Sequence, residues 1–129
     1  MNKQISLRIT LAGIVVVLLG SCAMFQAEKA GIVGTWTNSL GTVWVIKPDG
    51  MFEVTMAKST EPDVYGKYTI SGESITVEET KMKGPKSKHC KGPASYKFKR
   101  SGDNLTFTKV SDDCKLREKN ILAGWMKKK

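Results

Sequence analysis

Two stretches of the chain show the same alternation of apolar and polar residues, thirty positions apart. In residues 65–78 and 95–108, one alternating run leads into a Ser-Gly-acid turn, at Ser71 to Glu73 and at Ser101 to Asp103, and a second alternating run follows. Period-2 alternation on both sides of a short polar loop that contains Gly is typical of a β-hairpin with one buried face. The repeat therefore predicts a small antiparallel β domain.

The flanking segments predict further strands. A first strand begins near Gly34, and residues 42–46 and 51–57 form a pair joined by a Lys-Pro-Asp-Gly turn. In residues 43–46 both faces are apolar, so the sequence does not decide which one is buried. After Val110, a short turn or helix and a brief closing strand fit the pattern. Eight strands can close a small barrel and remove its exposed edges. We predict an all-β fold, an up-and-down antiparallel meander closed or nearly closed as a barrel.

The N-terminal segment reads as an export signal rather than as part of the fold. Residues 1–8 carry two basic residues and no acid, and residues 9–19 are apolar apart from Thr10 and Gly13. This is too short for a spanning helix, and it predicts a helical signal segment. The sequence Leu19 to Cys22 resembles the lipobox of bacterial lipoproteins, in which the cysteine is acylated. An ordinary signal peptide cut near Ala23 is the alternative.

The predicted organisation is a signal peptide over residues 1–21, a lipidated tether over 22–30 and the barrel domain over 31–129. Ala23 after the lipidated cysteine resembles the pattern that directs lipoproteins to the periplasmic face of the outer membrane. The whole chain carries a formal charge of +9, and loss of Lys3 and Arg8 with the signal leaves +7. Export excludes nucleic acid as the partner and favours an anionic lipid surface. The lysine-rich loop over residues 81–93 fits such a contact, although most loops of this kind are simply solvated.

Cysteine parity supports export. Acylation of Cys22 leaves Cys90 and Cys114 as an even pair in an oxidising compartment, where a disulfide is expected. Two other interpretations stay open, a metal site that includes His89 and a pair of unbridged thiols. Two cysteines with one adjacent histidine lack a fourth ligand at zinc spacing, so we predict no metal and no cofactor.

Gly34, Thr35 and Trp36 at the start of the meander resemble the Gly-x-Trp signature of lipocalins. In that family the Trp lies at the closed end of the barrel beneath a basic side chain from near the C-terminus. The resemblance therefore implies a pair between Trp36 and Arg117. We prefer Arg117 to Arg100 because Arg100 borders a turn, where its head group can reach water.

Most of residues 31–126 also resemble a group of small lipocalin-like domains in exported bacterial proteins. The matching features are a Gly-x-Tyr strand with a Gly-acid turn, a cysteine before a second glycine-containing strand, and an Asp-Asp-x-Cys segment followed by Arg, Leu and Trp. In this chain they are Gly66 to Tyr68, Gly72, Glu73, Cys90, Gly92 to Tyr96, Asp112 to Cys114, Arg117, Leu122 and Trp125. The barrel-forming part is shorter than in a ligand-carrying lipocalin.

The sequence predicts a protein that is not an enzyme. His89 has no paired nucleophile motif, and Glu78 and Glu79 face opposite sides of a strand. The resemblance favours a lipid-anchored envelope protein that binds a small apolar ligand or lipid on the inner face of the barrel. The residues expected to line that site are Trp36, Phe52, Val54, Met56, Tyr68, Phe98 and Phe107. The alternative is a non-catalytic interaction or inhibitor protein, with an envelope protein as partner, a fully packed barrel and functional loops.

Overall fold

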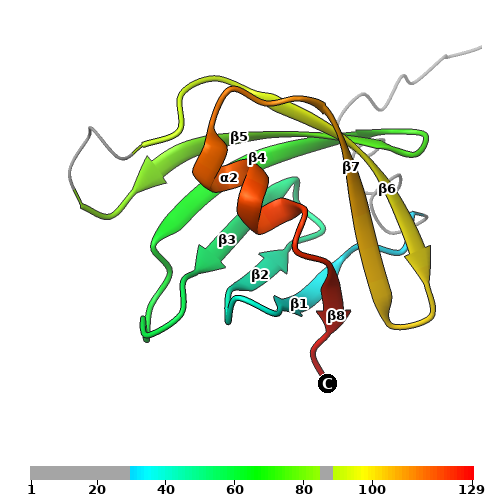
Figure 1. The fold of residues 1–129 in the computed structure, drawn as a ribbon, viewed down its shortest axis with the longest axis horizontal. Coiled ribbons are helices and arrows are strands. Elements are labelled where there is room, and N and C mark those ends of the chain that lie inside the picture. Colours follow the sequence, from blue (N-terminus) through cyan, green and yellow to red (C-terminus); the bar gives the residue numbers. More distant parts are fainter. Residues whose placement is uncertain (1–29, 85–88) are drawn as a thin grey trace, which may run out of the picture.

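The computed structural model describes residues 30–84 and 89–129, and these form a closed antiparallel barrel with one short helix (Figure 1). Each strand pairs with the next, and the last pairs with the first. The elements are β1 (Gly34–Asn38), β2 (Val43–Ile46), β3 (Met51–Thr55), β4 (Val64–Ser71), β5 (Ser74–Met82), β6 (Ala94–Ser101), β7 (Asn104–Ser111), α2 (Lys115–Ile121) and β8 (Trp125–Lys127). The predicted all-β meander and its eight-stranded closure are confirmed.

The two repeated hairpins have tighter turns than the sequence suggested. Ser71 pairs with Ser74 and Ser101 pairs with Asn104, so each loop contains only two residues. Gly72 and Gly102 both have φ +58, whereas the acidic residues after them do not have positive φ. This combination matches a type II′ turn, whose twist suits the flanking strands and which requires Gly at its first central position. The serines therefore belong to the strands.

The barrel interior is packed with aromatic and β-branched side chains. In β2, Trp44 and Ile46 face inward and are almost fully buried, while Val43 and Val45 are partly exposed, which resolves the register that the sequence left open. Trp44 stands near the centre of the core, with its ring centroid 5.3 Å from that of Trp125, 5.6 Å from Phe107 and 5.9 Å from Phe52. The wide indole fills space that Val43 and Val45 could not.

The two ends of the barrel are closed differently. At one end lie the turns between β4 and β5 and between β6 and β7, together with the segment that leads into β1. At the other end, the chain leaves β7 and forms α2, which lies against the barrel with Arg117 and Ile121 buried (Figure 1). Because consecutive strands run in opposite directions, α2 and the β6–β7 turn must lie at opposite ends.

This arrangement corrects the predicted pair between Trp36 and Arg117. The cations over the Trp36 indole are Arg100, with its guanidinium carbon 5.4 Å from the ring centroid, and Lys127, with Nζ at 5.9 Å. The Arg100 head group donates to the carbonyls of Gly31 and Gly102 and therefore stays over the ring. Arg117 is buried at the α2 end, where it pairs with Asp112. Basic side chains do lie over the Trp36 ring as expected, but they are Arg100 from β6 and Lys127 from β8.

The predicted disulfide is confirmed, because Cys90 is bonded to Cys114 with a sequence separation of 24. It ties the segment before β6 to the start of α2. The predicted signal peptide, Cys22 and all but the last residue of the predicted tether lie outside the described residues. Within residues 30–84 and 89–129, no helix combines the length and the apolar character that a membrane crossing requires.

Candidate functional site

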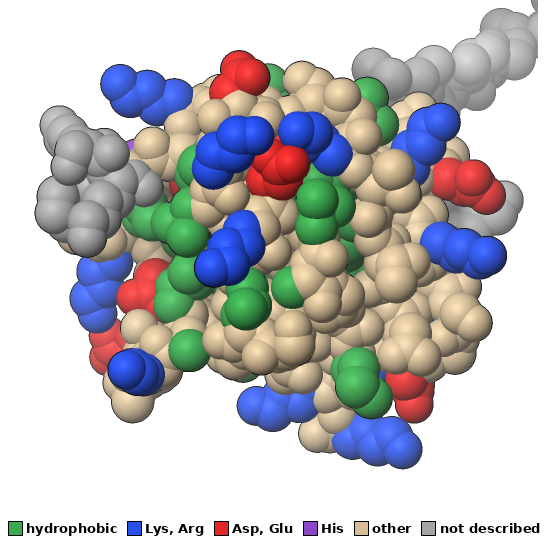
Figure 2. Space-filling view, viewed as in Figure 1, with side chains coloured by type: hydrophobic (Ala, Val, Ile, Leu, Met, Phe, Trp, Pro, Cys, Tyr) green, Lys and Arg blue, Asp and Glu red, His purple; other side chains and the backbone are tan. Residues whose placement is uncertain are grey.

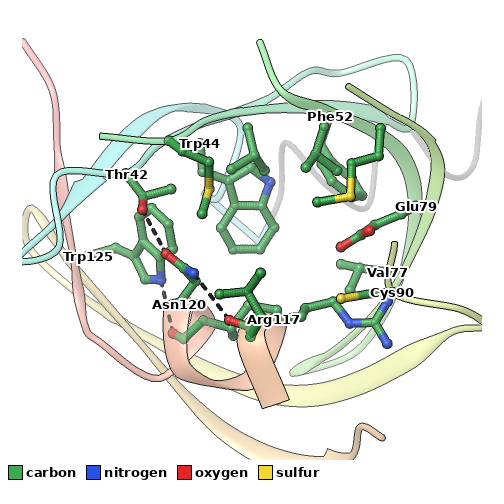
Figure 3. Close-up of a pocket in the computed structure, with 15 residues that line it drawn as sticks. Thr42, Trp44, Phe52, Val77, Glu79, Cys90, Arg117, Asn120 and Trp125 are labelled. Carbon is green, nitrogen blue, oxygen red and sulfur yellow. Dashed lines mark hydrogen bonds between the residues drawn. The ribbon is translucent and has the colours of Figure 1, made fainter. Parts of the chain in front are cut away.

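A cavity of about 60 Å³ lies inside the barrel beneath α2, and we call it the α2 pocket (Figure 3). Its walls come from β2, β3, β4, β5, α2 and β8 and from the loops at this end. The residues that line it are Thr42, Trp44, Phe52, Val54, Met56, Val64, Val77, Glu79, Met82, Cys90, Leu116, Arg117, Asn120, Ile121 and Trp125. Most of these side chains are apolar, and only a few can form hydrogen bonds with a guest.

Three of the seven predicted lining residues belong to this pocket, namely Phe52, Val54 and Met56. Trp36, Tyr68 and Phe107 are buried in the barrel core but do not line the cavity, and Phe98 is partly buried against that core. The expected set was the whole inward face, whereas the cavity occupies only the α2 end. Large side chains fill the rest of this narrow barrel.

A buried ion pair stabilises the side of the pocket that α2 covers. Arg117 Nη2 lies 2.8 Å from Asp112 Oδ1, and the two side chains are 5% and 0% exposed. Arg117 Nε also donates to Asp112, and Nη1 donates to the Gly92 carbonyl. The Tyr96 hydroxyl and the Cys114 backbone N–H add further hydrogen bonds to the same carboxylate. A buried charge needs this degree of compensation to be tolerated.

The network shifts the titration of each member. Burial opposes ionisation of Asp112, but the hydrogen bonds from Arg117, Tyr96 and the Cys114 N–H outweigh it and hold the pKa of this carboxyl below its ordinary value. Burial and the hydrogen bond to Asp112 both raise the pKa of Tyr96. Burial alone would lower the pKa of Arg117, yet Asp112 keeps it above its ordinary value. The ion pair is therefore fully formed at neutral pH.

Among the described lining residues, Glu79 is the one acidic side chain, and it reaches into the cavity from β5 (Figure 3). It continues the inward alternation of Ile75 and Val77. The register between β4 and β5 then shifts, because Gly66 pairs with Glu79 but Tyr65 pairs with Lys81, which leaves Thr80 as a bulge. Bulges of this kind redirect side chains at the rim of a barrel.

The environment of Glu79 disfavours its charged form. Burial raises the pKa of the Glu79 carboxyl, although the positive charge of Arg117 and the Cys90 backbone N–H oppose the effect. One carboxylate oxygen, Oε2, is buried without a hydrogen-bond partner among residues 30–84 and 89–129. A buried acceptor left in this state costs about 1 to 3 kcal/mol. Glu79 thus marks the polar point of an otherwise apolar cavity.

The aromatic side of the pocket depends on a close backbone approach. Phe52 pairs with Gly66 across β3 and β4, and a Cβ at Gly66 would come within 2.2 Å of Phe52 Cζ. Only Gly leaves room for the ring, and Phe52 in turn packs edge-on against Trp44. Trp44 is 2% exposed, and its Nε1 has no hydrogen-bond partner within the described part of the chain.

The other polar side chains of the pocket are satisfied inside the protein. Thr42 Oγ1 donates to Asn120 Oδ1 at 2.7 Å, and Asn120 Nδ2 donates to the Leu116 carbonyl at 3.1 Å. Arg117 is occupied by Asp112 and Gly92. Among the described lining residues, only Glu79 Oε2 and Trp44 Nε1 are buried polar side-chain atoms without a partner.

The pocket has an opening beside α2. Leu116 lines the cavity and is nevertheless 47% exposed, so it stands at the rim. Hydrophobic side chains gather on this face of the molecule, with Lys and Arg and also Asp and Glu side chains around them (Figure 2). An apolar opening bordered by charged side chains suits contact with an amphiphile.

Sequence reasoning missed Trp44, Glu79 and Asn120 as lining residues. A signal existed for Glu79, because strict period-2 alternation after Ile75 and Val77 places it on the inward face. Trp44 was hidden by two apolar faces on one short strand. Asn120 had no local signal, since its role depends on how α2 docks on the barrel.

Comparison with known proteins gives no assignment. No family model, no curated protein and no solved structure matches this chain. The function must therefore be argued from the α2 pocket itself.

Proposed function

We propose that this protein is a lipid-anchored protein of the cell envelope whose lipocalin-like barrel binds a small apolar ligand, or the apolar end of a lipid, in the α2 pocket. One observation carries the proposal: aromatic and aliphatic side chains enclose a cavity with an opening beside α2. Ligand sites are typically concave, mostly apolar and supplied with a few polar groups that orient the guest.

The size of the cavity limits the ligand. About 60 Å³ is several times the space that one water molecule requires. It is well below the roughly 300 to 1,000 Å³ of pockets for drug-sized molecules. The ligand therefore has only a few non-hydrogen atoms, or it is a longer molecule of which one end enters past Leu116.

The expected anchor on Cys22 gives the pocket a biological setting. Acylation would keep the barrel beside the bilayer, at the periplasmic face of the outer membrane, where amphiphiles are concentrated. Lys and Arg side chains that reach the membrane would add attraction to anionic lipid of about 1 kcal/mol for each basic residue near the surface. Both features favour a ligand that exchanges with the membrane.

The test is equilibrium dialysis with radiolabelled 1-butanol and 1-hexanol. The full-length protein is reconstituted in phosphatidylcholine nanodiscs, and empty nanodiscs are the blank. We expect saturable binding by the wild type. Val77→Phe, which fills the cavity, should weaken it, and Met82→Ala, which enlarges the cavity, should strengthen it. Val110→Phe is the matched control, because Val110 is exposed and lies outside the pocket.

The small cavity also favours a second candidate, an envelope protein with a packed barrel that binds a protein partner through its loops. The same dialysis separates the two candidates. If no saturable binding exceeds the blank, or if Val77→Phe binds as well as the wild type, the pocket is only a packing defect and the interaction protein is the better description.

A further inference from the structure

The α2 pocket carries information about the kind of headgroup it can accept. This inference rests on the proposed function, because it concerns the ligand of the same cavity. The starting point is Glu79 Oε2, a buried acceptor that no described residue satisfies. The side chain points into the cavity from β5, opposite the side formed by Thr42 and Trp125 (Figure 3). A guest that donates a hydrogen bond would satisfy this oxygen.

The charge of the pocket favours a cation. Glu79 and Arg117 line the cavity, and Asp112 is the ion-pair partner of Arg117. The formal charges of these three side chains sum to −1 when Glu79 is ionised. Arg117 already donates from Nε, Nη1 and Nη2 to Asp112 and Gly92, so these donor groups are engaged within the protein. With Glu79 ionised, the three side chains therefore keep one net negative charge.

The walls of the cavity also suit a cation. Trp44, Phe52 and Trp125 all line it, and the ring centroids of Phe52 and Trp125 lie 5.9 Å and 5.3 Å from that of Trp44. The faces of aromatic rings attract ammonium groups, and the attraction grows when water is excluded. An apolar tail can contact the aliphatic side chains of the same pocket. Aromatic rings around a single carboxylate are a favourable setting for an amine.

We infer that the α2 pocket selects a small amphiphile whose buried headgroup is a protonated amine, and that Glu79 is the residue that binds this headgroup. The ammonium donates to Oε2 and forms a charge-assisted hydrogen bond, which is roughly twice as strong as a neutral one. Burial raises the pKa of Glu79, and a bound cation offsets the cost of keeping its carboxylate charged.

The same geometry disfavours a fatty acid inserted headgroup first. Its carboxylate would meet Glu79, a like charge, and would find the Arg117 guanidinium engaged with Asp112 and Gly92. The buried Trp44 Nε1 could donate to it, but this neutral N–H brings no positive charge. An alcohol lies between the two cases, because it donates one neutral hydrogen bond and brings no charge. The predicted order of affinity is amine, then alcohol, then carboxylate.

The experiment compares n-butylamine, 1-butanol and butyrate by equilibrium dialysis against the full-length protein in phosphatidylcholine nanodiscs. We expect n-butylamine to bind at least about tenfold more tightly than 1-butanol, because it forms a charge-assisted hydrogen bond. Butyrate should bind most weakly. Glu79→Gln should remove the preference for the amine, so that n-butylamine and 1-butanol bind this variant with affinities within about twofold of each other. Glu78→Gln is the matched control, because Glu78 is next to Glu79 in the chain but does not line the pocket. Its Oε2 lies 3.9 Å from Lys67 Nζ instead.

Each outcome decides a different question. If 1-butanol binds but n-butylamine has no advantage, or if Glu79→Gln keeps the amine preference, the headgroup inference is wrong while the apolar pocket stands. If none of the three binds above the blank, the proposed function itself fails. Cooperative thermal unfolding of each variant in the absence of urea confirms that both are folded, so a loss confined to Glu79→Gln reports on the headgroup.

Discussion

Arg100 stacks over the indole of Trp36, with its guanidinium carbon 5.4 Å from the ring centroid, although the two residues are separated by most of the barrel sequence. Trp36 is fully buried, and its Nε1 donates to the Ile32 carbonyl at 2.9 Å. The Arg100 head group is fixed by the carbonyls of Gly31 and Gly102. Together these contacts close the end of the barrel opposite α2.

The first prediction is a coupling energy between these two residues. Arg100→Met keeps the apolar stem but removes the guanidinium, and Trp36→Phe removes the indole. The double mutant should lose about 0.5 to 1 kcal/mol less stability than the sum of the single mutants, because the cation–π contact is lost only once. Urea unfolding measures all four proteins. Lys99→Met, on the same strand, should be additive with Trp36→Phe, and coupling of equal size there would contradict the specific contact.

The second prediction concerns the buried pair of Asp112 and Arg117. Asp112→Asn leaves the Arg117 charge without its partner, and it should lower the free energy of unfolding at pH 7 by about 3 to 5 kcal/mol. Asp113→Asn, next in the chain and exposed, should change it by less than about 0.5 kcal/mol. Urea unfolding of both variants checks the difference. A small loss in Asp112→Asn would mean that the pair does not stabilise the fold.

The pH dependence of the wild type follows from the same pair. The pKa of Asp112 is lower in the folded protein than its ordinary value of 3.8. The stabilisation it contributes is therefore complete above about pH 4 and is lost as the pH falls through the folded-state pKa. Between pH 4 and pH 2, unfolding free energy should fall more steeply in the wild type than in Asp112→Asn. Parallel curves would show that another group is responsible.

The third prediction is a contribution to the free energy of unfolding that decreases as the pH rises, opposite to that of Asp112. The pKa of Glu79 is raised in the folded protein, so folding favours its protonated form. That contribution is present below about pH 4.5 and is lost as the pH rises through the folded-state pKa. Glu79→Gln should therefore gain stability relative to the wild type as the pH rises from 4 to 7. Urea unfolding across this range tests it, with Glu78→Gln as the control, and a constant difference would contradict it.

The fourth prediction is the contribution of the disulfide between Cys90 and Cys114. It closes a loop of about 25 residues, which corresponds to about 3 to 4 kcal/mol in the chain-entropy model. It also positions Cys90, whose backbone N–H opposes the rise in the pKa of Glu79, and Cys114, whose N–H donates to Asp112. The double Cys→Ser variant should unfold at lower urea concentration than the oxidised wild type. Reduced wild type should match that variant, and unchanged midpoints in both would overturn the prediction.

The fifth prediction tests the anchor, which lies outside the described residues. Cys22→Ser should abolish incorporation of labelled palmitate and either release the protein from the membrane fraction or leave the unprocessed precursor. Two acyl chains give stable anchoring, whereas one gives only marginal affinity. The variant with serine at positions 90 and 114 is the control and should still be labelled. Mature, membrane-bound protein after Cys22→Ser would contradict the lipoprotein interpretation.

Local patterns in the sequence were sufficient to predict the strands, the number eight and the disulfide. Alternation in β4 to β7 follows directly from the two-residue period of a strand, and each Gly-acid pair specifies a reversal of the chain. Parity among three cysteines, once one is assigned to lipid, leaves a single bridge. None of these inferences requires knowledge of which strands meet across the barrel.

The candidate site depended on contacts between distant parts of the chain. Arg100 and Arg117 are both basic residues near the end of the sequence, and only the antiparallel course of β6 and β7 places one over Trp36 and the other beside Asp112. The strand that contains Trp44 has apolar residues on both faces, so its inward face is defined only by the closed barrel. Glu79 was visible as an inward position, but its lack of a partner is a property of the assembled pocket.

The sequence by itself determined the strand pattern and the positions of the turns, and it is the basis for the predicted export and lipid signals, because each depends on residues that are neighbours in the chain. The tertiary structure decided which cation closes the barrel, where the cavity lies and which buried polar atoms face it. Charge pairing and cavity shape depend on distances between side chains up to tens of residues apart, and only the closed barrel with α2 docked on it sets those distances.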